Sequence, residues 1–254
     1  MKVLTTITDN ENYHYNKFLK ASCEHHNLEL VPLLTDKRIT TNFMDRMLGR
    51  VIGRPCGFQY KDQVVLNYLE KLPDNEIVFL TDGYDTAFLC GVDEIMRKWE
   101  KFNAPLVISA EVNCRPDKAL KDSYPRSSVP APYLNSGGII GHVDVLRETH
   151  QKVREINCRG PYAWSNQYRW TRFFLENPDL IKLDHQSEIF FCAASPPDKR
   201  TWDPGYWETN LFDGERIRLE HGARPCQLHF NGPVVTVMDE VMSRLFASSL
   251  SAHQ

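Results

Sequence analysis

The sequence lacks several features that would place it in a common class at once. No apolar run approaches the ~20 residues that a transmembrane helix needs. Lysine and arginine are not clustered and the net charge is −3, so the basic surface typical of a nucleic-acid-binding protein is not expected. There is also no internal repeat, low-complexity tract or domain linker. We therefore expect one soluble, globular domain that spans residues 1–254.

The cysteines form no motif in the sequence. Their number is odd, none makes a C-x-x-C pair, and they are scattered along the chain: Cys23, Cys56, Cys90, Cys114, Cys158, Cys192 and Cys226. This spacing indicates neither a zinc site nor a disulfide framework. We expect reduced thiols in a cytoplasmic protein. A first strand that begins at Lys2 leaves no room for a cleavable leader.

Apolar runs and helical patterns alternate along the chain. Residues 77–80 are a continuous apolar run, typical of a strand that is buried on both faces, and the mostly apolar residues 3–8 and 106–110 are also expected to be buried strands. Amphipathic patterns separate these runs. The alternation predicts an α/β fold, a Rossmann-like and mostly parallel sheet with helices on both faces.

Turn and helix-breaking residues predict the less regular segments. We expect a strand at 28–31 that stops at Pro32, a long loop at 35–58 that walls a site, a proline-rich loop at 113–132, a flap at 195–214 that carries Trp202, Tyr206 and Trp207, and a short alternating strand at 216–219.

The most informative stretch is Asp82-Gly83-Tyr84-Asp85, which follows the apolar run at 77–80. The glycine lets the chain turn sharply as it leaves the strand. Both carboxylates can then point at one spot beyond the carboxyl end of the sheet, where ligands bind in open α/β folds. Two hard oxygen donors at one spot suit Mg²⁺ or Mn²⁺. The alternative is an ordinary polar turn, because a motif this short recurs by chance.

Other polar residues also mark the ends of expected strands. Glu111 ends one strand, Asn135-Ser136 precedes a pair of glycines, and His229 ends a late strand. In a mostly parallel sheet these ends meet at one edge. His229 is then the candidate third metal ligand, and an imidazole beside carboxylates favours Mn²⁺ over Mg²⁺; the alternative is a surface or hydrogen-bonded histidine. Asn231-Gly232 either places N–H groups against phosphate oxygens or forms an ordinary turn.

Five segments occur together in an order that resembles one known family: residues 79–85, 109–111, 133–138, 183–190 and 229–232. They resemble the glycosyltransferase domain of the procollagen lysyl hydroxylase family and its stand-alone bacterial and viral relatives. The resemblance extends over roughly residues 2–233.

The resemblance implies a GT-A fold that binds a UDP-sugar and Mn²⁺, or Mg²⁺, and transfers a hexose to a hydroxyl acceptor on a glycan or a hydroxylated side chain. It implies that Asp82, Asp85 and His229 are the metal ligands. It also implies that the donor site contains Thr6 and Tyr84 at the nucleotide, Lys61, Asn231 and Gly232 at the phosphates, and Asn135, Ser136 and Gly137 beside the sugar.

The chain departs from the family on the acceptor side. Where the family carries an acidic pair followed by glutamine, this chain has Ser165-Asn166-Gln167. Neither Ser165 nor Asn166 can act as a carboxylate base. Besides Asn166 itself, we therefore consider Glu111 and Asp184 as candidate catalytic residues, although each could instead have a structural role.

Two other functions stay open on the sequence. The loss of the acidic pair suits a non-catalytic descendant that still binds a UDP-sugar. A metal-dependent nucleotidyltransferase or phosphohydrolase could also use an Asp-rich turn, but the chain has no G-x-x-x-x-G-K-[ST] loop. Trp164, Trp170, Trp202 and Trp207 could stack against sugar rings or simply pack in a core.

Overall fold

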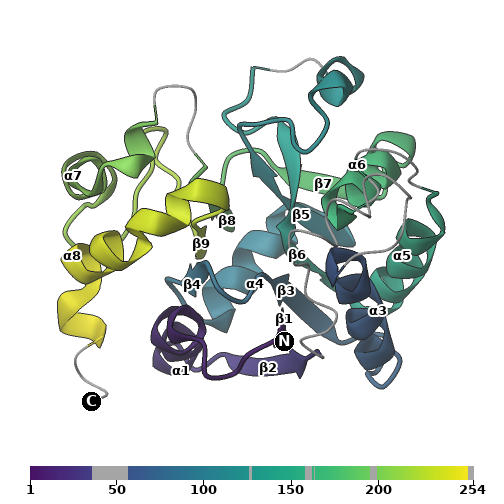
Figure 1. The fold of residues 1–254 in the computed structure, drawn as a ribbon, viewed down its shortest axis with the longest axis horizontal. Helices are drawn as coiled ribbons and strands as arrows, with labels where there is room; N and C mark the ends of the chain where they lie inside the picture. Colours follow the sequence, from purple (N-terminus) through teal and green to yellow (C-terminus); the bar gives the residue numbers. More distant parts are fainter. Residues whose placement is uncertain (36–56, 126–127, 158–161, 163, 195–198, 251–254) are drawn as a thin grey trace.

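At the centre of the molecule is a six-stranded sheet with helices on both faces (Figure 1). The structure is a computed structural model that describes residues 1–35, 57–125, 128–157, 162, 164–194 and 199–250. In spatial order the strands are β2 (Glu29–Leu34), β1 (Lys2–Ile7), β3 (Ile77–Thr81), β6 (Tyr133–His142), β5 (Leu106–Glu111) and β7 (Ile181–Asp184). Only β6 runs antiparallel to its neighbours, so the prediction of a mostly parallel sheet is confirmed.

The inner strands of the central sheet, β1, β3, β6 and β5, send alternate side chains into two separate cores. On β3, Val78 and Leu80 face one core, whereas Phe79 faces the other. On β5, Ile108 and Val107 divide in the same way. Burial on both faces explains why these strands are continuous apolar runs in the sequence rather than alternating ones.

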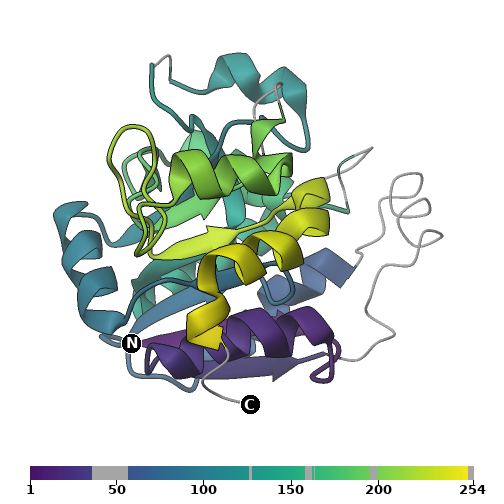
Figure 2. The same ribbon diagram turned by 90° about the vertical axis from the view of Figure 1, so that its left-hand side faces the viewer.

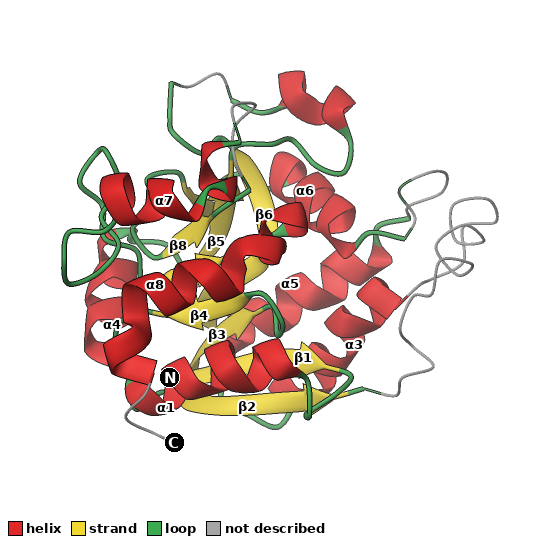
Figure 3. Cartoon of the chain, turned by 60° about the vertical axis from the view of Figure 1, so that its left-hand side comes forward, coloured by secondary structure: helices red, strands yellow, loops and turns green. Residues whose placement is uncertain are grey.

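Helices cover both faces of this sheet (Figure 3). Three helices contribute to the core that contains Val78 and Leu80: α3 (Gly57–Leu69), α5 (Val143–Glu155) and α6 (Asn166–Glu176). Three others contribute to the core that contains Phe79: η1 (Tyr15–Lys20), α1 (Ala21–His25) and α4 (Val92–Lys101). Leu146 and Val153 of α5 are two helical turns apart and both are fully buried, as expected for the apolar face of an amphipathic helix. None of the helices in the described part of the chain is both long and apolar enough to cross a membrane.

A second, three-stranded sheet lies beside the first. Its order is β4 (Thr86–Phe88), β9 (Gln227–His229) and β8 (Phe190–Cys192). The long helix α8 (Met238–Leu250) lies next to the small sheet (Figure 2). Four short helical segments complete this part of the molecule: η4 (Arg200–Trp202), α7 (Pro204–Tyr206), η5 (Trp207–Leu211) and η6 (Gly232–Val237). They enclose a third core in which the rings of Trp207 and Phe230 stack with centroids 5.1 Å apart.

Two predictions for individual segments are wrong. The strand expected to stop at Pro32 continues to Leu34 as β2. It tolerates the proline because β2 is an edge strand, which needs backbone hydrogen bonds on one side only. Residues 216–219 form no strand, because the segment pairs at a single position, between Ile217 and Phe212.

The expected flap and loops have mixed outcomes. Trp207 does not lie on a flap: its side chain is fully buried, and its indole N–H donates to the carbonyl oxygen of Thr201 (2.8 Å). The segment at 113–132 is mostly loop as predicted, with one turn of helix, η3 (Lys118–Ser123). Most of the expected loop at 35–58 lies outside the described residues.

Candidate active site

The carboxyl end of β3 leads into the turn that carries Asp82 and Asp85. The hydroxyl of Thr86 donates to the carbonyl oxygen of Asp82 (2.6 Å) and so closes the turn. A Cβ atom on Gly83 would lie 2.4 Å from the side chain of Ile7, which explains why glycine occupies this position. The turn brings both carboxylates beyond the end of the strand, as the sequence predicts.

His229 approaches the same point from the smaller sheet. Its Nε2 atom lies 3.3 Å from Oδ2 of Asp85 and 3.5 Å from Oδ2 of Asp82. One ligand atom from each of the three residues lies within 4.8 Å of the others. From the sequence, His229 was expected at the edge of the same sheet as the aspartates. It is instead the last residue of β9 in the smaller sheet. It comes close to the aspartates because it pairs with Thr86, the residue that directly follows Asp85.

Gly137 of β6 leaves the space in which these ligands meet. A Cβ atom at this position would lie 2.3 Å from Cε1 of His229 and 2.7 Å from Oδ2 of Asp82. The cradle therefore depends on a residue without a side chain. Two carboxylates and an imidazole that converge in such a cradle are a suitable donor set for Mn²⁺ or a related divalent cation.

Charges in this cluster act on each other strongly. Burial alone would lower the pKa of His229, but the neighbouring carboxylate of Asp85 raises it well above its ordinary value. Burial disfavours ionisation of Asp82 as well, yet the Lys61 ammonium group and His229 hold the pKa of this carboxyl below its usual range. Lys61, on α3, forms an ion pair with Asp82. The carboxylate of Asp82 is thus kept ionised between two positively charged side chains.

Glu111, at the end of β5, holds together one wall of the site. It is only 3% exposed, and its Oε1 atom accepts hydrogen bonds from the amide groups of Asn135 (2.9 Å) and Gln167 (3.1 Å). Its Oε2 atom accepts a bond from the amide group of Asn231 (3.3 Å). Burial raises the pKa of Glu111, although these amide donors favour its ionised form. One carboxylate therefore fixes side chains from three other segments.

The segments that Glu111 connects reach the site for different reasons. Because β6 is antiparallel, its N-terminal half, with Asn135 and Ser136, lies at the carboxyl edge of the parallel strands. Asn231 follows β9, and its Oδ1 atom accepts a hydrogen bond from the backbone N–H of Ala194 (2.8 Å). Gly232 next to it has a φ of 66°, a conformation that favours glycine.

Together these residues line a cavity of about 700 Å³. Ten of the residues predicted from the sequence are on its wall: Lys61, Asp82, Asp85, Glu111, Asn135, Ser136, Asn166, His229, Asn231 and Gly232. The structure therefore brings the whole predicted metal set and much of the predicted donor site to a single cavity.

Four predicted residues are not among the described residues that line the cavity. Gly137 lies against His229, as described above. Thr6 is part of β1, with its hydroxyl oxygen buried. The hydroxyl of Tyr84 accepts hydrogen bonds from the backbone N–H groups of Thr8 (2.7 Å) and Asp9 (3.0 Å), so it is tied to the segment after β1.

Asp184 is the fourth of these residues, and its surroundings give it a structural role. It is fully buried, and its carboxylate accepts hydrogen bonds from three successive backbone N–H groups, those of Glu188 (2.9 Å), Ile189 (2.7 Å) and Phe190 (2.8 Å). These bonds hold the turn between β7 and β8. The sequence correctly predicted that Asp184 ends a strand, but not that its carboxylate oxygens accept hydrogen bonds from the backbone.

Comparison with known proteins identifies the family. A family model described as the PLOD GT domain matches residues 1–240, which is most of the chain. The chain belongs to this family of glycosyltransferase domains. The resemblance deduced from the sequence motifs is therefore confirmed.

Relatives of this PLOD GT domain include proteins that are considerably longer than this chain. The human "Multifunctional procollagen lysine hydroxylase and glycosyltransferase LH3" is 29% identical over 195 residues, which are 73% of this chain and 24% of that protein. "Uncharacterized protein R699" of Acanthamoeba polyphaga mimivirus is 30% identical over 223 residues, which are 86% of this chain and 43% of that protein. The chain thus spans about a quarter of the length of the lysyl hydroxylase relative that it matches.

A solved structure supports the fold. The "glycosyltransferase involved in the glycosylation of the major capsid of PBCV-1" superimposes with a TM-score of 0.53 at 14% identity, and the match covers 96% of this chain and 98% of that one. At this level of identity the likeness concerns architecture only. It confirms the predicted GT-A fold.

The segment that departs from the PLOD GT family is part of the cavity wall. Ser165, Asn166 and Gln167 all line it. The hydroxyl of Ser165 accepts a hydrogen bond from the backbone N–H of Tyr168 (3.3 Å) and caps α6, a role that suits serine at the start of a helix. The segment in which the sequence departs from the family's acidic pair therefore lies on the cavity wall.

Sequence reasoning did not single out several residues of the cavity wall. Arg115 and Lys199 add two cations to the wall, and both come from segments that were interpreted only as loop or flap. Arg115 follows the end of β5 by four residues, and this proximity to a strand end was the available signal. Trp164 and Trp202, considered as stacking residues, do line the cavity, whereas Trp170 and Trp207 are fully buried in cores.

Proposed function

We propose that residues 1–254 act as a single metal-dependent glycosyltransferase domain that transfers a hexose from a UDP-sugar to a hydroxyl acceptor, with Mn²⁺ as the preferred cation. The observation that carries this proposal is the convergence of Asp82, Asp85 and His229 on the wall of a 700 Å³ cavity in a member of a glycosyltransferase family. The mixed oxygen and nitrogen donor set favours Mn²⁺ over Mg²⁺.

The donor half of the cavity suits a nucleoside diphosphate. A divalent cation held by Asp82, Asp85 and His229 supplies positive charge for the departing diphosphate. Lys61 and Arg115 add fixed positive charge on the same wall. We propose that the backbone N–H groups at Asn231 and Gly232 face the phosphates, because this segment follows His229 directly and lines the cavity.

The acceptor half depends on the chain's own polar side chains. Among the described residues that line the cavity, Glu111 is the one carboxylate that is not a proposed metal ligand. Its oxygens already accept three amide hydrogen bonds, so we assign it a positioning role toward Asn135 and Asn231. We propose that the acceptor binds beside Asn166 and Gln167, which line the cavity at the position of the family's acidic pair while their side chains hydrogen-bond to Asp62 and Glu111.

A second candidate is a non-catalytic protein that binds UDP-sugars, and one observation favours it. The cavity wall carries Ser165 and Asn166 at the position of the missing acidic pair. A third candidate, a nucleotidyltransferase or phosphohydrolase, loses support because the family model covers residues 1–240.

The experiment that separates these functions is a turnover assay with a panel of UDP-sugars, with Mn²⁺ or with chelator. The acceptors are free glycans and peptides that contain hydroxylysine, and both released UDP and glycosylated product are measured by mass spectrometry. Mn²⁺-dependent transfer supports the proposal. Mn²⁺-dependent UDP binding without release of UDP on any acceptor supports the non-catalytic alternative. Release of pyrophosphate or inorganic phosphate contradicts both.

A further inference from the structure

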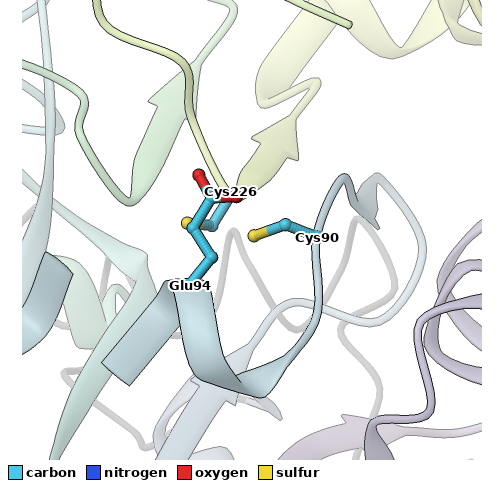
Figure 4. A group of neighbouring side chains, drawn as sticks. All are labelled: Cys90, Glu94 and Cys226. Atoms are coloured by element: carbon cyan, nitrogen blue, oxygen red, sulfur yellow. The ribbon is translucent and has the colours of Figure 1, made fainter. Parts of the chain in front are cut away.

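Two cysteines that are far apart in the sequence meet at the base of the small sheet. Cys90 follows β4 and Cys226 precedes β9, and these two strands pair in antiparallel register. The backbone N–H of Leu89 donates to the carbonyl oxygen of Cys226 (2.7 Å), so the two chain segments lie against each other beyond the ends of the strands. The donor atoms of Cys90, Cys226 and Glu94 all lie within 4.8 Å of one another (Figure 4).

This cluster has the composition of a metal site, but the state of Glu94 argues against one. Both of its carboxylate oxygens accept hydrogen bonds from the guanidinium group of Arg216, each at 2.8 Å. The Lys98 ammonium group lies 2.8 Å from Oε1 of the same carboxylate. A bidentate pair between an arginine and a carboxylate, here half-buried, is among the strong hydrogen-bonded arrangements in proteins. The Glu94 carboxylate is therefore already paired with Arg216 and Lys98. Of the three donor groups in the cluster, only the two sulfur atoms remain available for a new interaction.

We propose that Cys90 and Cys226 form a disulfide bond that joins β4 to β9. Both residues are almost completely buried, at 6% and 0% exposure. Their two sulfur atoms lie within 4.8 Å of each other, so a small movement of the side chains is enough to join them. The bond would hold together the two strands that carry Thr86 and His229 at their other ends.

The bond forms by exchange with a small-molecule disulfide such as oxidised glutathione. The thiolate of Cys90 attacks one sulfur of the small disulfide and releases one thiol. The thiolate of Cys226 then attacks the Cys90 sulfur of this mixed disulfide and releases the second thiol. Two electrons pass from the protein to the small disulfide, and the two protein protons end on the released thiols. Burial and the contact with Cys226 raise the pKa of the Cys90 thiol, so exchange in the folded protein is slow.

The consequence concerns stability. A bond between positions so distant in the chain closes a long loop and restricts the unfolded state. We expect the oxidised protein to melt about 5–10 °C above the reduced protein. This inference does not rest on the proposed transferase activity, because bond formation and melting are measured on the protein itself.

The test compares the full-length protein after metal chelation in reduced and oxidised glutathione buffers. Free thiols are blocked with N-ethylmaleimide under denaturing conditions, and the peptides are mapped by mass spectrometry. We expect a linked peptide pair that contains Cys90 and Cys226, together with the rise in melting temperature. Cys90→Ala should lose both effects, whereas Cys23→Ala, which removes another buried thiol from the same core, should keep both.

Two results would overturn the proposal. The first is alkylation of both thiols even in the fully oxidised buffer, measured on the wild-type protein so that no variant has to fold. The second is stoichiometric zinc in the protein before chelation that disappears in Cys90→Ala while both thiols stay reduced. That second result would make the cluster a metal site instead.

Discussion

The Nε2 atom of His229 lies 3.3 Å from Oδ2 of Asp85, although the two residues are far apart in the sequence. The pairing of β4 with β9 produces this contact, since Thr86 of β4 is paired with His229 of β9. A strand pair of only three residues on each side therefore determines whether the proposed metal site exists.

Gly137→Ala should damage the metal site through size alone. The added methyl group would lie 2.3 Å from Cε1 of His229 and 2.7 Å from Oδ2 of Asp82, so at least one ligand must move. We expect the affinity for Mn²⁺ and UDP, measured by calorimetry, to fall by more than about tenfold, and overpacking to cost about 1–3 kcal/mol in urea unfolding. Gly205→Ala is the matched control, because the nearest atom there is an Asp203 carboxylate oxygen at 3.2 Å. Unchanged affinity in Gly137→Ala would contradict the described cradle.

Glu111→Gln tests the positioning role of this carboxylate. Glutamine keeps the shape but places an NH₂ group opposite at least one amide donor of Asn135, Gln167 or Asn231. We expect a loss of about 1–3 kcal/mol in stability because a buried polar group loses its partner. Transfer should fall roughly 10- to 100-fold through kcat more than through KM. Glu148→Gln, on the exposed face of α5, should change neither quantity, and a Glu111→Gln enzyme with wild-type kcat would exclude the role.

Restoring an acidic residue at Asn166 should destabilise this chain. Asn166 is buried and its side chain hydrogen-bonds to Asp62, which is itself buried. A second carboxylate there would repel the first, so Asn166→Asp should lose about 1–3 kcal/mol at pH 7. The double variant with Asp62→Asn should recover most of this loss, which a double-mutant cycle in urea measures. Additive effects of the two substitutions would show that the side chains do not interact.

The buried pair Asp62 and His150 should give opposite pH dependences. His150 Nδ1 lies 3.6 Å from Asp62 Oδ1; burial lowers the pKa of His150 to about 3 and raises the pKa of Asp62 to about 6. Between pH 7 and pH 5 the unfolded chain alone takes up a proton at His150, so this residue makes stability fall. Over the same range the folded protein alone takes up a proton at Asp62, so that residue makes stability rise.

Substitutions at this pair should therefore change the pH slope in opposite directions. Between pH 7 and pH 5, His150→Phe should lose about 2 kcal/mol less stability than the wild type, and Asp62→Asn should lose about 1 kcal/mol more. Urea unfolding at both pH values gives each difference relative to the wild type, so other titrating groups cancel. Parallel pH profiles for all three proteins would contradict these pKa values.

The sequence was sufficient for the central sheet and for part of the site. The apolar run at 77–80 identified β3 because a strand buried on both faces has a continuous apolar sequence, and the following Asp-Gly-Tyr-Asp located the turn. The small sheet could not be predicted, since its strands have three residues each and pair across most of the chain. That sheet places His229, buries Trp207 and brings Cys90 to Cys226, so all three were misjudged or missed in the sequence.

Side-chain direction was the other limit of the sequence. Glu111 and Asp184 both end strands of the central sheet and looked equivalent. The structure separates them: Glu111 reaches three side-chain amides on the cavity wall, whereas Asp184 accepts three backbone N–H groups in a turn. Ser165 is a similar case. A serine can cap a helix and also line a cavity, so the residue type alone did not show that Ser165 does both.

Isothermal titration of UDP in the presence of Mn²⁺ tests the central claim most directly. The wild-type protein should bind UDP with Mn²⁺ present and lose this binding with chelator. His229→Ala and Asp85→Asn should each weaken it by roughly 100-fold, about 2.7 kcal/mol, while His221→Ala, an exposed control, should bind as the wild type does. Undiminished Mn²⁺-dependent UDP binding in both ligand variants would contradict the metal site on which the account depends.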